Sequence, residues 1–306
     1  MAPVRTVVPT RVKASLSLLR LACPRPQRRR AATMSAPPTP KDVGAMYDAL
    51  TDLLSQALGD NIHAGYWQDA QDTSNVAQAA DRLTGLVGQR LRTGAGQHVL
   101  DVGCGSGRPA VRIAAASGSR VTGITVSGHQ LSLARARPEA SAPDGMLEFR
   151  QADAMRLPFP DASFDAAYAI ESLLHMSDQR TALAHLARVL RPGGRLVVAD
   201  LCLSTVPHGA DADDVAAASQ VFQVSSIASP DEYRTLLEEA GFKVEEFSDI
   251  APHVRRTYAV VARTMCQAGE SIGGELAVQL DGAAASVERF GTLDCIGYAL
   301  VTAVRP

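Results

Sequence analysis

The sequence predicts an α/β fold in which helices cover both faces of a doubly wound, mostly parallel sheet. Three observations favour this class. Strand-like and helix-like segments alternate from residue 97 to residue 200, the connections between them are short, and one strand runs directly into a glycine-rich turn and a helix (VLDVGCGSGRPA, 99–110). Such alternation is typical of parallel sheets, whose ligands lie beyond the carboxyl ends of the strands. The 306 residues suffice for one such domain with helical additions, which we place at 40–306.

The first elements are helical. Apolar residues at mixed spacings of three and four predict an amphipathic helix over 40–58, and a second helix follows over 75–91. The loop between them, 61–67, contains the only tryptophan. Strands and helices then alternate, with strands at 97–102, 119–124, 147–151, 164–169 and 195–200 and helices at 108–117, 127–137 and 177–190. The RPGG segment, 191–194, predicts a sharp turn between a helix and the next strand.

The alternation is interrupted after residue 203. Helical patterns at 211–224, 231–240, 252–267 and 274–290 surround a strand at 243–248 and precede a seventh strand at 296–304. Helices inserted between late strands would cover the open edge of the sheet. We therefore predict a helical lid that selects the ligand, formed by about 203–242 and 252–291.

Charge divides the chain into two parts. Residues 1–40 carry eight basic side chains and no acidic one, whereas the remainder has 22 basic and 32 acidic residues, a net charge of −10. We expect residues 1–39 to be a disordered, proline-rich leader, which is either an organellar targeting segment or a dispensable stretch upstream of a start at Met34. No basic, aromatic-laced face indicates nucleic acid, and no apolar run approaches the roughly 18 residues of a membrane span. The five cysteines are widely spaced with no C-x-x-C pair, which favours a reduced, cytoplasmic protein without a metal site.

The glycine-rich turn is the strongest functional signal. Gly103, Gly105 and Gly107 follow a strand that ends near Asp101. Glycine permits positive φ and lets backbone N–H groups approach a ligand closely. The G-x-G-x-G spacing is tighter than the G-x-G-x-x-G of dinucleotide folds, so no pyrophosphate needs to be cradled. A purely structural glycine turn in another α/β protein is the alternative.

This motif, with Asp101, resembles the first motif of the class I S-adenosylmethionine (SAM) methyltransferases, which implies a Rossmann-like seven-stranded sheet and SAM as cofactor. The segment GITVSGHQ, 123–130, is similar to the branch that contains cyclopropane fatty acid synthases, geranyl diphosphate C-methyltransferase and the rebeccamycin sugar O-methyltransferase. The resemblance implies that Thr125 and Val126 flank the ribose or adenine and that Gln130 binds ribose hydroxyls. Alternatively, Gln130 is a solvated helix residue.

Two further segments complete the predicted cofactor site. In QADAMRLPF, 151–159, Asp153 and the Ala154 backbone are placed to recognise an adenine amino group as acceptor and donor. Asp153 could instead only cap a helix. The segments MYDALTD and NIHAGYW resemble the same branch, in which the position of Tyr47 contacts the SAM carboxylate and the region of Trp67 lines the cofactor. A pure core role for Tyr47 and Trp67 is the alternative.

The candidate catalytic residues follow the fourth strand, in AIESLLHMSD, 169–178. A hydroxyl acceptor needs a base, and His175 titrates near neutrality. In the similar sugar O-methyltransferases two histidines stand here and an acidic partner ends the fifth strand, whereas this chain has Leu174, His175 and Asp200. The resemblance thus implies a His175 base supported by Asp200, with a structural or SAM-contacting role for His175 as the alternative. Glu171 is a candidate for stabilising a carbocation.

We therefore predict a SAM-dependent methyltransferase that acts on a small, largely apolar natural product of secondary metabolism, with O-methylation of a hydroxyl as the leading reaction. Leu174, Val221, Phe222 and Val224 indicate an apolar acceptor pocket. C-methylation of a terpenoid or prenyl double bond through a carbocation is the second hypothesis, and a non-catalytic SAM-binding protein is a third. Cyclopropanation is disfavoured because the cysteine and glutamate arrangement that binds bicarbonate in those enzymes is not found. The expected partner is a small-molecule acceptor, without nucleic acid or membrane, and the chain could form a homo-oligomer.

Overall fold

A computed structural model describes residues 37–137 and 145–306, so the predictions for residues 1–36 lie outside the described part. The chain forms a seven-stranded sheet in the order β3-β2-β1-β4-β5-β7-β6, which confirms the predicted fold class. The first five strands pair in parallel, and β7 is antiparallel to both β5 and β6. The strands are β1 (His98–Val102), β2 (Arg120–Thr125), β3 (Leu147–Gln151), β4 (Phe164–Ile170), β5 (Leu190–Leu203), β6 (Lys243–Asp249) and β7 (Ile296–Val304).

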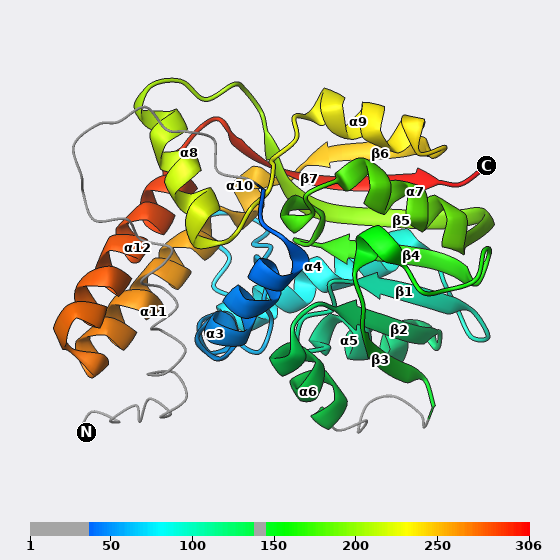
Figure 1. The fold of residues 1–306 in the computed structure, drawn as a ribbon, viewed down its shortest axis with the longest axis horizontal. Helices are drawn as coiled ribbons and strands as arrows, with labels where there is room; N and C mark the ends of the chain where they lie inside the picture. The colour runs from blue at the N-terminus through cyan, green and yellow to red at the C-terminus, as the bar shows by residue number, and fades with distance from the viewer. Residues whose placement is uncertain (1–36, 138–144) are drawn as a thin grey trace.

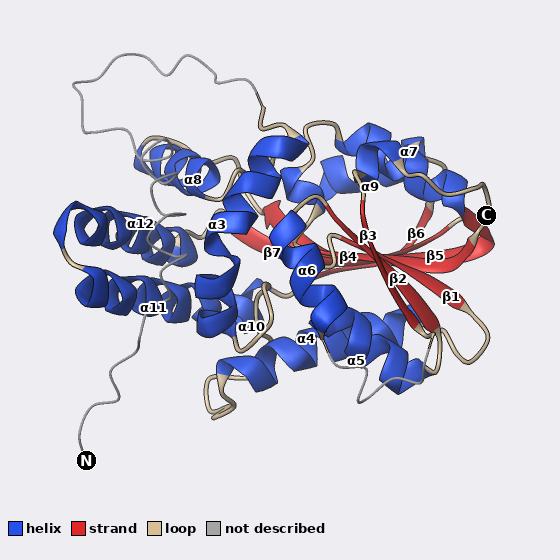
Figure 2. Ribbon diagram, turned by 60° about the horizontal axis from the view of Figure 1, so that its bottom comes forward, coloured by secondary structure: helices blue, strands red, loops and turns tan. Residues whose placement is uncertain are grey.

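The helices form two layers on the sheet and a separate group at the carboxyl ends of the parallel strands (Figures 1 and 2). Their bounds are α3 (Pro40–Leu58), α4 (Val76–Leu91), α5 (Arg108–Ser117), α6 (Gly128–Ala136), α7 (Gln179–Val189), α8 (Ala210–Val221), α9 (Pro230–Glu239), α10 (Ala251–Val254), α11 (Arg256–Ile272) and α12 (Gly274–Thr292). Most predicted helices therefore begin and end within a few residues of the observed ones. None of the helices in the described part is long and apolar enough to cross a bilayer.

Alternating strand residues divide the core of the sheet. Val99 faces a cluster that includes α4, α5 and α6, whereas Leu100 and Val102 face a cluster that includes α7 and α9. This alternation is what the period of two along a strand requires when both faces are covered. The carboxyl ends of the strands are thereby fixed relative to one another, which positions the loops that follow them.

The RPGG segment lies inside β5, although a turn before the strand is predicted. Leu190 already pairs with Phe164, and the ladder resumes at Arg195, which pairs with Ala166. Gly193 has φ +78°, and its N–H donates to the Arg305 carbonyl at 2.7 Å. The turn is therefore a bulge within the strand, and its backbone groups form hydrogen bonds with the backbone of Arg305. The strand thus begins earlier than predicted.

The third helical group consists of α3, α8, α11 and α12, which pack around a separate apolar cluster. Figure 2 shows this group beside the sheet and beyond one end of its strands. The predicted lid includes α9, but α9 packs on α7 and β6 and places Tyr233 and Leu237 in the core of the sheet. In this stretch α8 lies with the helical group, whereas Ala228 and the apolar face of α9 are buried in the core of the sheet.

Candidate active site

Two adjoining cavities lie where the sheet meets the helical group. The first, about 700 Å³, is lined by residues at the carboxyl ends of β1, β2 and β4, and the second, about 830 Å³, is lined largely by α3, α8, α11 and α12. Four residues line both cavities and form a shared wall: Tyr47, Ile62, Glu171 and His175. A group transferred between two bound molecules would have to pass this wall.

The glycine loop forms the floor of the first cavity. Gly103 (φ +79°) and Gly105 (φ +53°) line it, and a Cβ on Gly103 would lie 2.5 Å from the Ser172 Cβ. Gly107 does not line the cavity. A Cβ there would lie 2.9 Å from the Phe149 ring, so this glycine allows α5 to begin close to β3. Two of the three predicted glycines thus contact the space for a ligand, and the third serves packing.

Asp101 supports the loop from below and does not line either cavity, contrary to the prediction of a cofactor contact. It is 2% exposed, lies beside Tyr168 of β4 in the sheet, and its Oδ2 has no hydrogen-bond partner among the described residues. Burial raises the pKa of Asp101 to about 7. Strand β1 is fully covered at this point, which is why the carboxyl group is enclosed.

Gln130 is 3% exposed and lines the first cavity, so the alternative of a solvated helix residue is wrong. Its Oε1 accepts a hydrogen bond from Thr125 Oγ1 at 2.8 Å, and its Nε2 donates to Thr51 Oγ1 at 3.3 Å. These two bonds orient the amide and leave one N–H and one lone pair for a ligand. Thr125 and Val126 line the cavity beside it.

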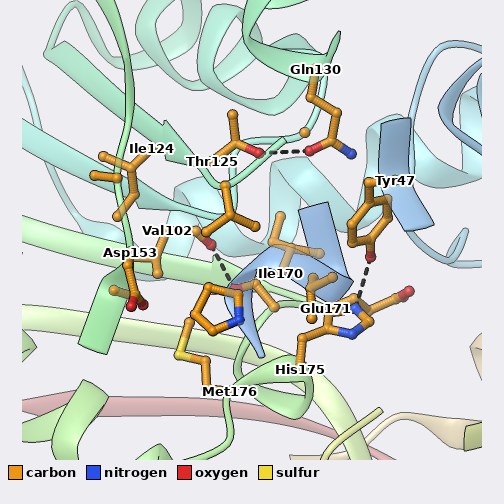
Figure 3. Close-up of a pocket in the computed structure, with 18 of the residues that line it drawn as sticks. Tyr47, Val102, Ile124, Thr125, Gln130, Asp153, Ile170, Glu171, His175 and Met176 are labelled. Carbon is orange, nitrogen blue, oxygen red and sulfur yellow. Dashed lines mark hydrogen bonds between the residues drawn. The ribbon is translucent and has the colours of Figure 1, made fainter. Parts of the chain in front are cut away.

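Asp153 lies across the first cavity from Gln130 (Figure 3). Its Oδ1 accepts a hydrogen bond from the Met155 N–H at 2.9 Å and caps a short 3₁₀ turn, while no donor in the described part of the chain reaches Oδ2. The capping and ligand-binding interpretations are therefore compatible. Ala154, Ile124 and Met176 add apolar wall. The first cavity thus has apolar walls, the free Oδ2 of Asp153 on one side and the oriented amide of Gln130 on the other. This arrangement fits the adenosine part of SAM.

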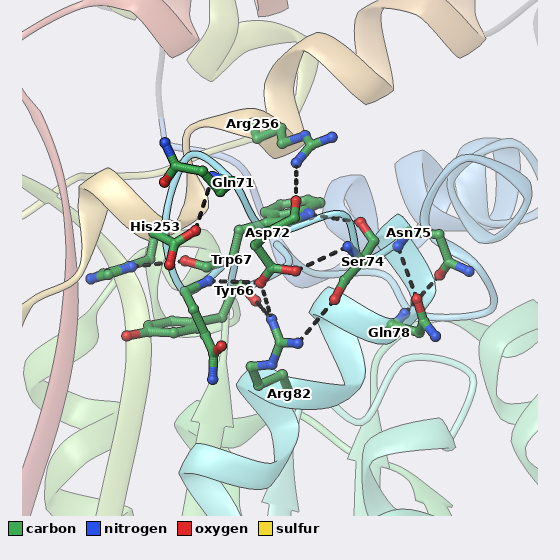
Figure 4. Close-up of polar contacts among 12 residues, drawn as sticks. Tyr66, Trp67, Gln71, Asp72, Ser74, Asn75, Gln78, Arg82, His253 and Arg256 are labelled. Carbon is green, nitrogen blue, oxygen red and sulfur yellow. Dashed lines mark hydrogen bonds and ion pairs between the residues drawn. The ribbon is translucent and has the colours of Figure 1, made fainter.

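Trp67 lines neither cavity, contrary to the prediction. Its Nε1 donates to the Ser74 carbonyl at 3.0 Å, and the Arg256 guanidinium lies 5.3 Å from its ring centre. Tyr66 stacks on His253 with ring centres 4.4 Å apart. Figure 4 shows these residues in a polar network that joins the loop before α4 to α10 and α11. The core role that the sequence left open for Trp67 is the one observed.

His175 is held between Tyr47 and the segment after α8. Its Nε2 lies 2.8 Å from the Tyr47 hydroxyl (Figure 3). Its Nδ1 lies 3.1 Å from the Gln223 carbonyl. A carbonyl only accepts, so we assign the proton to Nδ1, and Tyr47 then donates to Nε2. Burial lowers the pKa of His175 to about 4, which keeps the ring neutral near pH 7. The chain thus holds an unprotonated nitrogen on the wall between the cavities.

Asp200 makes no hydrogen bond to His175, which corrects the predicted pair. Asp200 is fully buried and lines neither cavity. Its Oδ2 accepts hydrogen bonds from the Leu174 N–H and the Tyr233 hydroxyl, each at 3.1 Å, and its Oδ1 accepts one from the Leu201 N–H at 2.9 Å. Asp200 therefore fixes the turn that carries His175. The partner of His175 is Tyr47, for which the sequence resemblance implied only a cofactor contact.

The buried carboxyl groups predict a pH-dependent stability. Burial, and secondarily the charge of Glu171, raises the pKa of Asp200 to about 8, and burial raises that of Asp101 to about 7. Above pH 3.8 the unfolded chain has released protons that the folded chain still binds, so stability declines as the pH rises towards 8. We expect these two carboxyl groups to lower the free energy of unfolding by on the order of 2 kcal/mol between pH 6.5 and 8, against a smaller opposing contribution from His63, His98 and His175, whose pKa values burial lowers to about 4. Urea unfolding at both pH values, with Asp200→Asn as the variant that flattens the slope, measures this; an equal slope in the variant contradicts it.

Comparisons with known proteins agree with this geometry. Residues 100–198 match the family model described as a methyltransferase domain. The chain is 46% identical over 272 residues to the O-methyltransferase resE of Aspergillus sclerotiorum, covering 89% of this chain and 100% of the relative. It is 38% identical to the 27-O-demethylrifamycin SV methyltransferase of Amycolatopsis mediterranei (strain S699), covering 88% and 98%. The solved structure of the [4+2]-cyclase SpnF superposes with a TM-score of 0.76 at 34% identity, covering 89% and 98%.

Proposed function

The chain belongs to the class I SAM-dependent methyltransferases, and we propose that it methylates a hydroxyl group of a small, neutral, largely apolar natural product of secondary metabolism. The names of the fungal and bacterial relatives support oxygen as the methylated atom. The observation that carries the proposal is the Tyr47–His175 pair on the wall shared by the two cavities.

The first cavity would hold SAM. We assign the adenine amino group to the free Oδ2 of Asp153, the ribose hydroxyls to Gln130, and the closest backbone approach to Gly103 and Gly105. When bound, SAM supplies an electrophilic methyl group on a positively charged sulfur. The residues of the chain then need only to align the acceptor with that group and to remove the acceptor's proton.

Tyr47 and His175 would remove that proton. A hydroxyl is a poor nucleophile until it loses its proton, and a positioned base contributes roughly 10²–10⁴-fold. Tyr47 lines both cavities, and its hydroxyl already donates to the free Nε2 of His175. As the acceptor O–H bond breaks, its proton passes to the Tyr47 oxygen, and the Tyr47 proton passes to Nε2. The imidazolium that forms keeps its Nδ1–H bond to the Gln223 carbonyl.

The second cavity would hold the acceptor. Its walls are mostly aliphatic and aromatic, with Phe222, Tyr258 and Phe290 among them, and no lysine or arginine is found among the described residues that line it. Such walls favour a neutral molecule over a diphosphate, whose charge would be buried without a cation. The second hypothesis, C-methylation of a prenyl double bond, is less favoured, because its attack step gives the Tyr47–His175 pair no proton to remove.

Turnover of methyl-labelled SAM with two acceptor sets tests the proposed class of substrate. One set contains neutral polycyclic phenols and alcohols, and the other contains geranyl diphosphate. We expect labelled product only from the neutral set, measured after organic extraction, with acid phosphatase treatment to release any labelled methylgeraniol from its diphosphate. Labelled methylgeraniol would contradict the proposal, as would stoichiometric SAM binding without transfer to any neutral acceptor.

A further inference from the structure

Glu171 has an unusual backbone and a fixed carboxylate. Its φ is +47°, in the left-handed region that side-chain-bearing residues rarely adopt, and its N–H donates to the Ala199 carbonyl at 2.8 Å. Its Oε1 accepts two hydrogen bonds, from the Ala64 N–H at 2.7 Å and from the Tyr298 hydroxyl at 2.8 Å. The second carboxylate oxygen is therefore held in one place by bonds made to the first.

That second oxygen, Oε2, has no donor among the described residues. Glu171 retains some accessible surface, and because it lines both cavities, that surface is open to them. The walls provide no lysine or arginine in the described part of the chain to neutralise the carboxylate. Burying a carboxylate oxygen without a hydrogen-bond donor costs free energy, and a ligand that brings a donor to the oxygen would remove this cost.

Glu171 borders both cavities, and its chain neighbours Ile170 and Ser172 line the first cavity and not the second. Ala64, which donates to Oε1, and Tyr258 line the second cavity and not the first. No hydrogen bond reaches the Tyr258 hydroxyl within residues 37–137 and 145–306. Burial, and next the negative charge of Glu171, raises the pKa of Tyr258, so that its hydroxyl remains a donor. A residue with a free acceptor and a residue with a free donor thus line the same cavity.

We propose that Glu171, with Tyr258 of the same cavity, binds a second hydroxyl group of the acceptor, so that the preferred substrates carry two hydroxyls, one at Tyr47 and His175 and one at Glu171. This inference rests on the proposed function, since it assigns the second cavity to the acceptor. The second hydroxyl donates to Glu171 Oε2 and can accept from Tyr258. Glu171 thereby selects and orients the acceptor, while the Tyr47–His175 pair takes the proton.

Binding of two probes of nearly equal size tests the inference without turnover. The affinities of 2,3-dihydroxynaphthalene and 2-naphthol are measured by calorimetry for the full-length protein saturated with S-adenosylhomocysteine. We expect the wild-type protein to prefer the diol by roughly tenfold, the order of gain expected from one added hydrogen bond. Glu171→Gln should reduce this ratio to about twofold or less. The control Phe222→Leu, in the apolar wall, should weaken both probes equally and leave the ratio unchanged.

Other outcomes distinguish this inference from its competitors. Tyr298→Phe, which removes one donor to Oε1 and keeps the carboxylate, should lower the ratio partly and serves if Glu171→Gln does not fold. An unchanged ratio in Glu171→Gln, accompanied by weaker S-adenosylhomocysteine binding, would assign the carboxylate to the cofactor and overturn the inference. Equal affinity of the wild-type protein for the two probes, including absent binding of both, would also overturn it. A preserved ratio without methyl transfer would contradict the proposed reaction and leave the diol site standing.

Discussion

Replacing His175 with alanine is expected to slow methyl transfer to a hydroxyl acceptor by roughly 10²–10⁴-fold, because the nitrogen that finally receives the acceptor's proton is lost. The affinity for SAM should change little, since the oriented polar groups of the first cavity, Gln130 and Asp153, remain. Single-turnover rates with labelled SAM, and SAM binding measured by calorimetry, separate the two effects.

Two comparison variants sharpen this result. Tyr47→Phe keeps the ring and removes the relaying hydroxyl, so its rate should fall by about tenfold or more while His175 can still accept a proton directly. His208→Ala, at an exposed position that lines neither cavity, should leave the rate unchanged. A wild-type rate in His175→Ala would show that the histidine only supports the turn.

Replacing Gly103 with alanine is expected to weaken SAM binding by at least about 100-fold. The new Cβ would lie 2.5 Å from the Ser172 Cβ, and the φ of +79° would be strained for any side chain. Ser172 cannot withdraw freely, because its Oγ donates to the Val102 carbonyl at 2.6 Å. The loop that forms the floor of the first cavity must therefore shift, which calorimetric titration with SAM would detect.

Gly282→Ala is the matched control for this substitution. Gly282 lies inside α12, and a Cβ there would meet nothing within 4 Å. Alanine should stabilise the helix by about 0.5–1 kcal/mol and leave SAM binding unchanged. Unaltered SAM binding by Gly103→Ala would show that the cofactor does not depend on the geometry of this loop.

The fold was predictable because local signals and long-range packing agree. The run from Val99 to Gly107 combines a buried strand with glycines that adopt positive φ, and both features appear in the structure. The exception is α9, whose amphipathic pattern is equally compatible with covering a ligand or covering the sheet. Its burial against α7 and β6 depends on tertiary packing, which the spacing of apolar residues along one helix does not predict. The same limit applies to β5, which continues through the bulge at 191–194.

The cofactor side of the site was more predictable than the catalytic side. Gln130 and Asp153 follow strand ends, so their place at the sheet edge comes from the topology. The supposed His175–Asp200 pair fails because the Asp200 carboxyl group accepts its hydrogen bonds from the Leu174 N–H, the Leu201 N–H and the Tyr233 hydroxyl instead. The Gln223 carbonyl that sets the His175 tautomer is a backbone group, and no residue type signals it. Tyr47 reaches His175 only because α3 packs across the cavity opening.

The position of the transferred methyl group in the product is the most direct test of the proposed O-methylation. The protein is incubated with ¹³C-methyl SAM and two acceptor pools, hydroxylated aglycones or glycosides and prenylated or terpenoid compounds, and the chemical shift of the product methyl carbon is read by NMR. We predict a methyl carbon that is bound to oxygen and has the downfield shift of a methoxy group. A methyl carbon bound to carbon would contradict this prediction and would leave the Tyr47–His175 pair without its assigned role in activating the acceptor.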